Sequence, residues 1–143
     1  MANNRILLVD DEEDFTNALS ERLENRGLKV VTVDSGVAAI QTIKKEHFDA
    51  VILDILMPEM DGIETLKHML NENPDLQIIL LTGQASLEKG IEAMKIGAMD
   101  FLEKPADIEK LMAQIKAAKG RKILLAEKKM EKQLKNILKT KGW

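Results

Sequence analysis

Polar side chains stand directly after short apolar runs at several places in the sequence: Asp10, Asp11, Asp54, Thr82 and Lys104. If these runs are parallel strands, their carboxyl ends meet at one edge of a sheet, where open α/β folds bind ligands. Up to three carboxylates would then share one crevice, which is costly without a compensating cation. A hard divalent ion answers this need, and Mg²⁺ is the common choice. Lys104 would add a second positive charge, and Thr82 a hydroxyl donor.

This combination suits a phosphoryl group in transfer, because the charge of that group lies on its equatorial oxygens. Asp54 is the expected nucleophile, since aspartyl phosphates are an established covalent intermediate. Each residue also has a plainer interpretation. Acids such as Asp10 and Asp11 favour helix starts, Thr82 suits a strand, and a lysine is a common surface charge. Each plain interpretation is adequate alone, but all of them holding together at strand ends is much less expected.

The elements that would position these residues alternate between strand and helix five times, with short loops between them. This alternation predicts a doubly wound parallel sheet with helices on both faces. Asp34, Ser35 and Gly36 are expected to cap the second helix, and Asp107 the fifth. The expected strands cover 5–9, 28–33, 50–54, 76–81 and 99–102, and the expected helices cover 14–26, a stretch from 36, 63–70, 85–96 and 107–119.

Composition is that of an ordinary globular domain, with 45% apolar and 31% charged residues among 143. The chain has no cysteine, which excludes disulfides and thiolate metal sites, and its two histidines lie far apart. We find no signal peptide or membrane span and therefore expect a cytoplasmic protein. The net charge of −3 divides unevenly, with −10 over residues 1–106 and +7 over residues 107–143.

Four segments together resemble the receiver domain of two-component response regulators: 6–11, 54–62, 81–83 and 101–105. The resemblance runs in order from residue 5 to about 119, and we assign residues 1–119 as the receiver domain. It implies a flavodoxin-like fold with strand order 2-1-3-4-5. The implied function is a phosphorylation-activated switch, rather than an enzyme acting on other substrates. Its phosphoryl donor would be a histidine kinase or a histidine phosphotransfer protein.

The resemblance also implies a role for each site residue. Asp54 would accept the phosphoryl group, while Asp10, Asp11 and the backbone carbonyl of Leu56 would complete the Mg²⁺ site. Lys104 would contact the phosphoryl group, just before a cis peptide bond to Pro105. The switch pair would be Thr82 and Phe101: the hydroxyl moves toward the phosphoryl group and the ring turns inward.

Two other functions remain open at this point. A phosphatase of the haloacid dehalogenase type also uses an aspartate nucleophile, but it carries a second acid two residues later, where this chain has Leu56. The chain also lacks a cap domain that could enclose a substrate. A degenerate receiver acting only as an interaction module is the other alternative, and the presence of the full site set argues against it.

Residues 120–143 form a basic tail with no recognisable DNA-binding module. Its apolar residues recur at steps of three or four, which predicts a narrow stripe on a helix. The tail, expected as a helical extension, could continue the fifth helix and pair with a second copy, link to an effector domain, or bind nucleic acid or membrane by charge. We favour pairing or linking, since a lysine-rich helix face is usually solvated. A homodimer could form through the tail or through the fourth and fifth helices.

Overall fold

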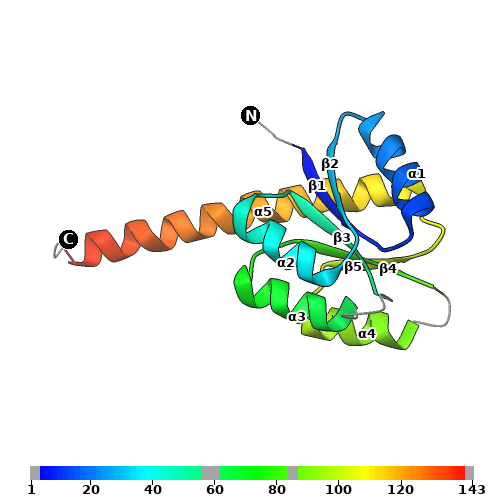
Figure 1. Cartoon of the computed structure of the whole chain (residues 1–143). Coiled ribbons are helices and arrows are strands. Elements are labelled where there is room, and N and C mark those ends of the chain that lie inside the picture. The colour runs from blue at the N-terminus through cyan, green and yellow to red at the C-terminus, as the bar shows by residue number, and fades with distance from the viewer. Residues whose placement is uncertain (1–3, 56–61, 84–86, 141–143) are drawn as a thin grey trace.

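The computed structural model describes residues 4–55, 62–83 and 87–140. Within these residues strands and helices alternate along the chain (Figure 1). The strands are β1 (Arg5–Val9), β2 (Lys29–Val33), β3 (Ala50–Asp54), β4 (Ile78–Thr82) and β5 (Asp100–Glu103). The helices are α1 (Glu13–Glu24), α2 (Gly36–Lys45), α3 (Gly62–Glu72), α4 (Leu87–Ile96) and α5 (Ile108–Thr140).

The strands form one parallel sheet in the order β2-β1-β3-β4-β5, which confirms the predicted fold. Alternate residues of the central strands point to opposite faces. Leu53 on β3 and Leu80 on β4 pack in the cluster that includes α2, α3 and α4. Ile52 and Ile79, one residue earlier on each strand, pack in the cluster that includes α1 and α5. Figure 1 shows these two helix layers with the sheet between them.

The central strands are buried on both faces, which explains their continuous apolar sequences. Every residue of β3 and of β4 is buried, including the polar residues that end them, Asp54 and Thr82. A parallel strand enclosed by helices has no solvent face and therefore no polar alternation. Both polar residues sit at the carboxyl edge of the sheet, as expected.

Two predicted helix caps are confirmed. The Ser35 side chain accepts a hydrogen bond from the backbone N–H of Ala38 at 3.1 Å, at the start of α2. The Asp107 carboxylate accepts from the N–H groups of Glu109 and Lys110 at 2.9 and 3.3 Å, at the start of α5. Each cap satisfies donors that the first turn of a helix leaves without a partner.

Helix α5 includes both the predicted fifth helix and the predicted helical extension in one continuous helix. The receiver part was expected to end near residue 119, and the tail after it was predicted to be helical. That helical extension is confirmed: α5 runs without a break through Gly120 to Thr140, so that the whole helix, Ile108–Thr140, has 33 residues. At 1.5 Å per residue the helix is about 50 Å long. Figure 1 shows its first part against the sheet and its last part projecting beyond the other elements. A single glycine costs a helix only about 1 kcal/mol relative to alanine, so Gly120 does not stop it.

Lysines of α5 contact the loops at the amino ends of the strands, opposite the acidic edge. Lys122 donates to the carbonyl of Phe48 at 3.1 Å and lies 3.5 Å from a carboxylate oxygen of Asp49, just before β3. Lys129 forms an ion pair with Asp75, shortly before β4. We call Lys122 and Lys129 with these partners the lysine clasp. These contacts join the basic second half of the helix to the acidic body.

None of the helices in the described ranges combines the length and the apolar content needed to cross a bilayer.

Candidate functional site

The predicted site residues converge at the carboxyl edge of the sheet. Asp10 follows β1 and is 2% exposed, Asp54 ends β3 at 4%, and Thr82 ends β4 with no exposure. Lys104 follows β5, and its backbone N–H donates to the Thr82 carbonyl at 2.8 Å. This bond ties the exit of β5 to the end of β4, so the lysine starts from a fixed point beside the acids.

The Lys104 ammonium lies among three carboxylates. Its Nζ is 2.8 Å from Asp10 Oδ2, 2.9 Å from Glu12 Oε1 and 3.4 Å from Asp54 Oδ2. Burial alone would lower the pKa of Lys104, because it disfavours the charged form. The hydrogen bonds to Asp10 and Glu12 and the negative charges of Asp54 and Asp10 outweigh burial and raise this pKa above its ordinary value. The lysine therefore remains a cation throughout the neutral range.

An aromatic ring also contacts this ammonium. Lys104 Nζ lies 4.5 Å from the centroid of the Phe15 ring, on the first turn of α1. A cation over an aromatic face is attracted by the quadrupole of the ring. The segment from Asp10 to Phe15 thus contributes two carboxylates and a ring to the surroundings of one lysine.

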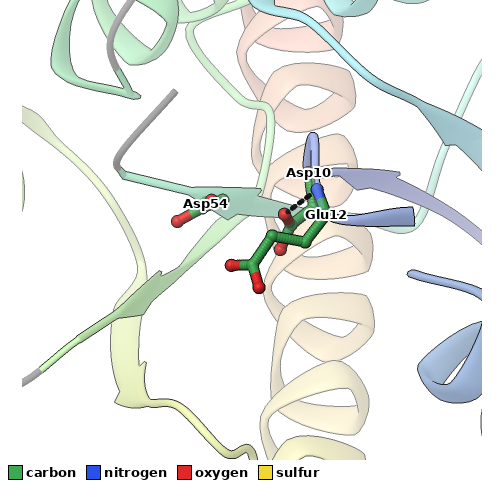
Figure 2. A group of neighbouring side chains, drawn as sticks. All are labelled: Asp10, Glu12 and Asp54. Carbon is green, nitrogen blue, oxygen red and sulfur yellow. Dashed lines mark hydrogen bonds between the residues drawn. The ribbon is translucent and has the colours of Figure 1, made fainter. Parts of the chain in front are cut away.

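Three carboxylates in this site are close enough to share a metal ion. One oxygen each from Asp10, Glu12 and Asp54 lie within 4.8 Å of one another (Figure 2). These donors are all oxygens, which suits a hard cation such as Mg²⁺. Asp10 Oδ2 is buried, with the Lys104 ammonium as an ion-pair partner, so this pocket already carries positive charge beside its acids.

Glu12 belongs to this group, and sequence reasoning missed it. Its backbone N–H donates to Asp10 Oδ1 at 2.9 Å, the dashed line in Figure 2. The acidic run from Asp10 to Glu13 indicated that an acid could lie here, but the sequence does not show which of these side chains turns toward Lys104. Asp11 was predicted beside Asp10, but here its side chain is exposed. It lines a neighbouring groove with Thr32 and residues of the α1 and α2 starts.

The predicted switch residues, Thr82 and Phe101, both lie beside Gly90 of α4. The Thr82 hydroxyl donates to the Leu102 carbonyl at 3.3 Å, so it is engaged with the backbone of β5. Phe101 is partly buried and packs with the core cluster of α4. A Cβ atom at Gly90 on α4 would lie 3.5 Å from the Phe101 ring and 3.6 Å from Thr82 Cγ2. Strand end, ring and helix therefore form one packed group.

The start of α3 packs directly on the exit of β3. The Gly62 N–H donates to the Ile55 carbonyl at 2.8 Å. A Cβ atom at Gly62 would lie 2.3 Å from Ile55 Cα, so only glycine fits there. Leu56, whose carbonyl was predicted as a metal ligand, lies outside the described residues. The predicted cis peptide bond between Lys104 and Pro105 is present.

These features define the class of protein: a flavodoxin-like α/β domain with an acidic, lysine-containing site at the carboxyl edge of its sheet. Within that class, the chain belongs to the response regulator receiver domain family, whose model matches residues 6–116. The predicted resemblance is thereby confirmed, and the chain is a signalling domain of two-component systems.

Similar proteins agree with this assignment. The chain is 38% identical to the transcriptional regulatory protein ZraR of Klebsiella oxytoca over 113 residues, covering 79% of this chain and 26% of ZraR. It is 35% identical to the regulatory protein AtoC of Escherichia coli over 136 residues, covering 95% of this chain and 28% of AtoC. The chain thus spans about a quarter of the length of these relatives, and the AtoC alignment extends into the basic tail.

Two solved structures have the same fold. A response regulator receiver domain protein from Clostridium thermocellum superposes with a TM-score of 0.80 at 35% identity, covering 85% of this chain and 98% of that one. A structure of adenylate cyclase from Rhodopirellula baltica superposes with a TM-score of 0.84 at 34% identity, covering 94% of this chain and 98% of that one. The second match includes much of the long α5 helix.

Proposed function

We propose that this domain accepts a phosphoryl group on Asp54 from a phosphohistidine of a histidine kinase or a histidine phosphotransfer protein. The observation that carries the proposal is the Lys104 ammonium, 3.4 Å from Asp54 Oδ2 at the buried edge of the sheet. A fixed cation beside the acceptor stabilises charge on the phosphoryl oxygens without reorganising during transfer.

The reaction exchanges one bond for another. An oxygen of the Asp54 carboxylate attacks phosphorus, an O–P bond forms, and the N–P bond to the histidine breaks. The imidazole leaves with the electron pair of that bond. Lys104 pairs with the phosphoryl oxygens as charge gathers on them, and its raised pKa keeps it protonated. Self-catalysed transfer and later hydrolysis of the acyl phosphate are the domain's expected chemistry, rather than turnover of a separate substrate.

We further propose that Mg²⁺ is the cofactor. The donor set fits it, because the candidate ligands are clustered carboxylate oxygens. Asp10 and Asp54 would hold the ion, with Asp11 turning in from the rim. When bound, Mg²⁺ would neutralise phosphoryl charge. Asp10 already lies 2.8 Å from Lys104, so the residue would serve both cations.

The proposed switch begins at Thr82. Its hydroxyl would leave the Leu102 carbonyl, 3.3 Å away in this structure, and donate to the phosphoryl group. Phe101 would then turn into the space that the threonine side chain vacates. Since both residues pack beside Gly90, the change would reach the exposed face of α4, where Ile91 and Met94 are 48% and 37% exposed.

The output lies with partners. ZraR is named as a transcriptional regulatory protein, and this chain corresponds to about a quarter of it. We propose that the domain acts in the cytoplasm beside its kinase, and that α5 carries the signal to an effector. The basic tail, residues 120–143, serves as this connection, and no DNA-binding module is proposed within this chain.

A second copy is the proposed partner of the tail itself. Past the lysine clasp, Met130, Leu134 and Ile137 lie on one face of α5 and are 70%, 58% and 53% exposed. The part of α5 beyond Lys129 covers residues 130–140 in the described structure, and an isolated helix that short is marginal in water without packing. Removal of residues 120–143 should give a monomer that is still phosphorylated, while the full chain dimerises. Light scattering that finds monomers for both would leave the tail as a linker.

The phosphorylation proposal is tested by labelling with radioactive acetyl phosphate in the presence of Mg²⁺. The wild type should take up label, Asp54→Asn should not, and chelation of divalent ions should abolish uptake in the wild type. Asp75→Asn is a matched control, since Asp75 lies at the opposite edge of the sheet and should leave labelling unchanged. Full labelling of Asp54→Asn would reject the assignment.

A further inference from the structure

Glu12 occupies a position where its side chain does not serve its own helix. It is the N-cap residue of α1, and its side chain makes no capping hydrogen bond. Serine, threonine, aspartate or asparagine would be preferred there, because their short side chains reach the free N–H groups of the first turn. The Glu12 carboxylate instead lies 2.9 Å from Lys104 Nζ. The Glu12 side chain therefore contacts the lysine and does not cap its own helix.

The backbone of Glu12 is held in place on both sides. Its N–H donates to Asp10 Oδ1 at 2.9 Å, and its carbonyl accepts from the N–H and the hydroxyl of Thr16, both at 2.9 Å. Its side chain is 64% exposed, whereas the side chains of Asp10 and Asp54 are 0% and 6% exposed. Glu12 thus reaches to Lys104 from the rim, while the other two acids form the buried floor.

Lys104 is drawn toward the α1 side of the site. The lysine lies closer to Glu12 and Asp10 than to Asp54, and the Phe15 ring faces the same ammonium. A phosphoryl group on Asp54 would bring more negative charge to the other side of the lysine. The ammonium has three N–H donors and already lies 2.8 to 3.4 Å from three carboxylates. The additional oxygens of a phosphoryl group would therefore compete with Asp10 and Glu12 for these donors.

We propose that Glu12 is the resting partner of Lys104, and that a phosphoryl group on Asp54 must displace Glu12 from the lysine. Glu12 is a positioning residue, since it acts through Lys104 rather than on the reacting atoms. The inference rests on the proposed phosphorylation of Asp54. It predicts that Glu12 weakens phosphoryl binding, the opposite of what an added metal ligand would do.

Beryllofluoride, a phosphoryl mimic, serves as the probe in an NMR titration at saturating Mg²⁺ for each variant. Glu12→Gln should bind it about two- to fivefold more tightly than the wild type, the value of a partly exposed ion pair. Glu12→Asp keeps the charge but shortens the side chain, so it should also bind more tightly. Glu13→Gln removes a neighbouring acid and should match the wild type.

Unchanged or weaker binding by Glu12→Gln would overturn the inference, as would wild-type affinity in Glu12→Asp. A second readout is independent of phosphorylation: the Lys104 side-chain resonances of the unliganded protein should shift in Glu12→Gln and not in Glu13→Gln. If those resonances stay unchanged, the resting pair is absent. If they shift but the wild type does not bind beryllofluoride, the proposed function fails instead.

Discussion

Gly90 on α4 faces the ring of Phe101, and a Cβ atom on Gly90 would lie 3.5 Å from that ring. This distance is ordinary van der Waals contact, so packing does not demand a glycine there. In the middle of a helix, glycine costs about 1 kcal/mol relative to alanine. We connect the glycine instead with the space it leaves beside Phe101 and Thr82, the two residues that move in the proposed switch.

Gly90→Ala should therefore stabilise the fold and impair the switch. We expect the free energy of unfolding to rise by about 0.5–1 kcal/mol, with smaller beryllofluoride-induced NMR shifts in α4 and β5. Gly120→Ala is the matched control, because its Cβ would meet nothing within 4 Å. It should stabilise α5 and leave those shifts intact. Shifts of wild-type size in Gly90→Ala would show that the space is not used.

Gly62→Ala should destabilise the domain strongly. The added Cβ would lie 2.3 Å from Ile55 Cα and 2.8 Å from the Asp54 carbonyl oxygen, so backbone must move. Overpacking of this kind costs about 1–3 kcal/mol or more, measured by urea denaturation. Gly83→Ala, where a Cβ would meet nothing within 4 Å, should cost far less. Equal stability of the two variants would contradict the tight joint between β3 and α3.

Lys104→Ala should make the stability of the domain depend on Mg²⁺ more strongly than in the wild type. Without the ammonium, the carboxylates of Asp10, Glu12 and Asp54 repel one another, and a divalent ion is the remaining source of compensation. The melting temperature of the variant should rise with Mg²⁺ more than that of the wild type. The variant should also lose the phosphorylation-induced changes in α4 and α5. If the melting temperatures of the variant and the wild type rise equally with Mg²⁺, Lys104 does not compensate the charge of the metal-binding carboxylates.

The contribution of Lys104 to stability should depend on pH in a definite direction. The pKa of this lysine is raised in the folded state, so its contribution to stability is complete below the ordinary lysine pKa of about 10.5 that applies in the unfolded state. That contribution falls only as the pH rises from there through the raised folded-state pKa. The stability difference between wild type and Lys104→Ala, at fixed metal concentration, should stay constant between pH 7 and 9. A loss of this difference within that range would contradict the raised pKa.

The lysine clasp should order the tail. Replacing Lys122 and Lys129 together by alanine removes the contacts with Phe48, Asp49 and Asp75. Amide hydrogen exchange over residues 121–140 should then accelerate. Replacing the exposed Lys128 and Lys132 changes the charge equally, and no ion pair of theirs is seen in the described residues. Equal acceleration in the two double variants would show that loss of positive charge, and not loss of these particular contacts, speeds up the exchange.

Much of the fold was predictable because local signals agreed with one another. Buried parallel strands have continuous apolar sequences, and Ser35 and Asp107 are short polar residues before helical patterns. The sheet order came from the resemblance rather than from the patterns. The helical tail was predicted, but whether Gly120 separates it from the fifth helix was not, because a breaking glycine and a tolerated one look alike in sequence. The helix continues past Gly120 because helix-forming residues come after it, and two lysines among them reach acidic loops.

Asp10, Asp54, Thr82 and Lys104 were predicted to lie close together because each stands at the end of an expected strand, and the structure brings them to one edge of the sheet. Sequence reasoning did not identify Glu12, because its partner Lys104 is 92 residues away and the choice among adjacent acids depends on loop geometry. The predicted metal role of Asp11 stays a prediction, since its side chain is exposed in this structure. Side-chain direction at a strand-to-loop exit is the information that a sequence pattern lacks.

Chemical trapping of the acyl phosphate tests the assignment of Asp54 most directly. Borohydride reduces an aspartyl phosphate to homoserine, and mass spectrometry of the peptides locates the converted residue. After treatment with acetyl phosphate and Mg²⁺, homoserine should appear at position 54 and nowhere else, and it should be absent when Mg²⁺ is chelated. Homoserine at Asp10 or Asp11, or none at position 54 in a protein shown to carry phosphate, would contradict Asp54 as the acceptor.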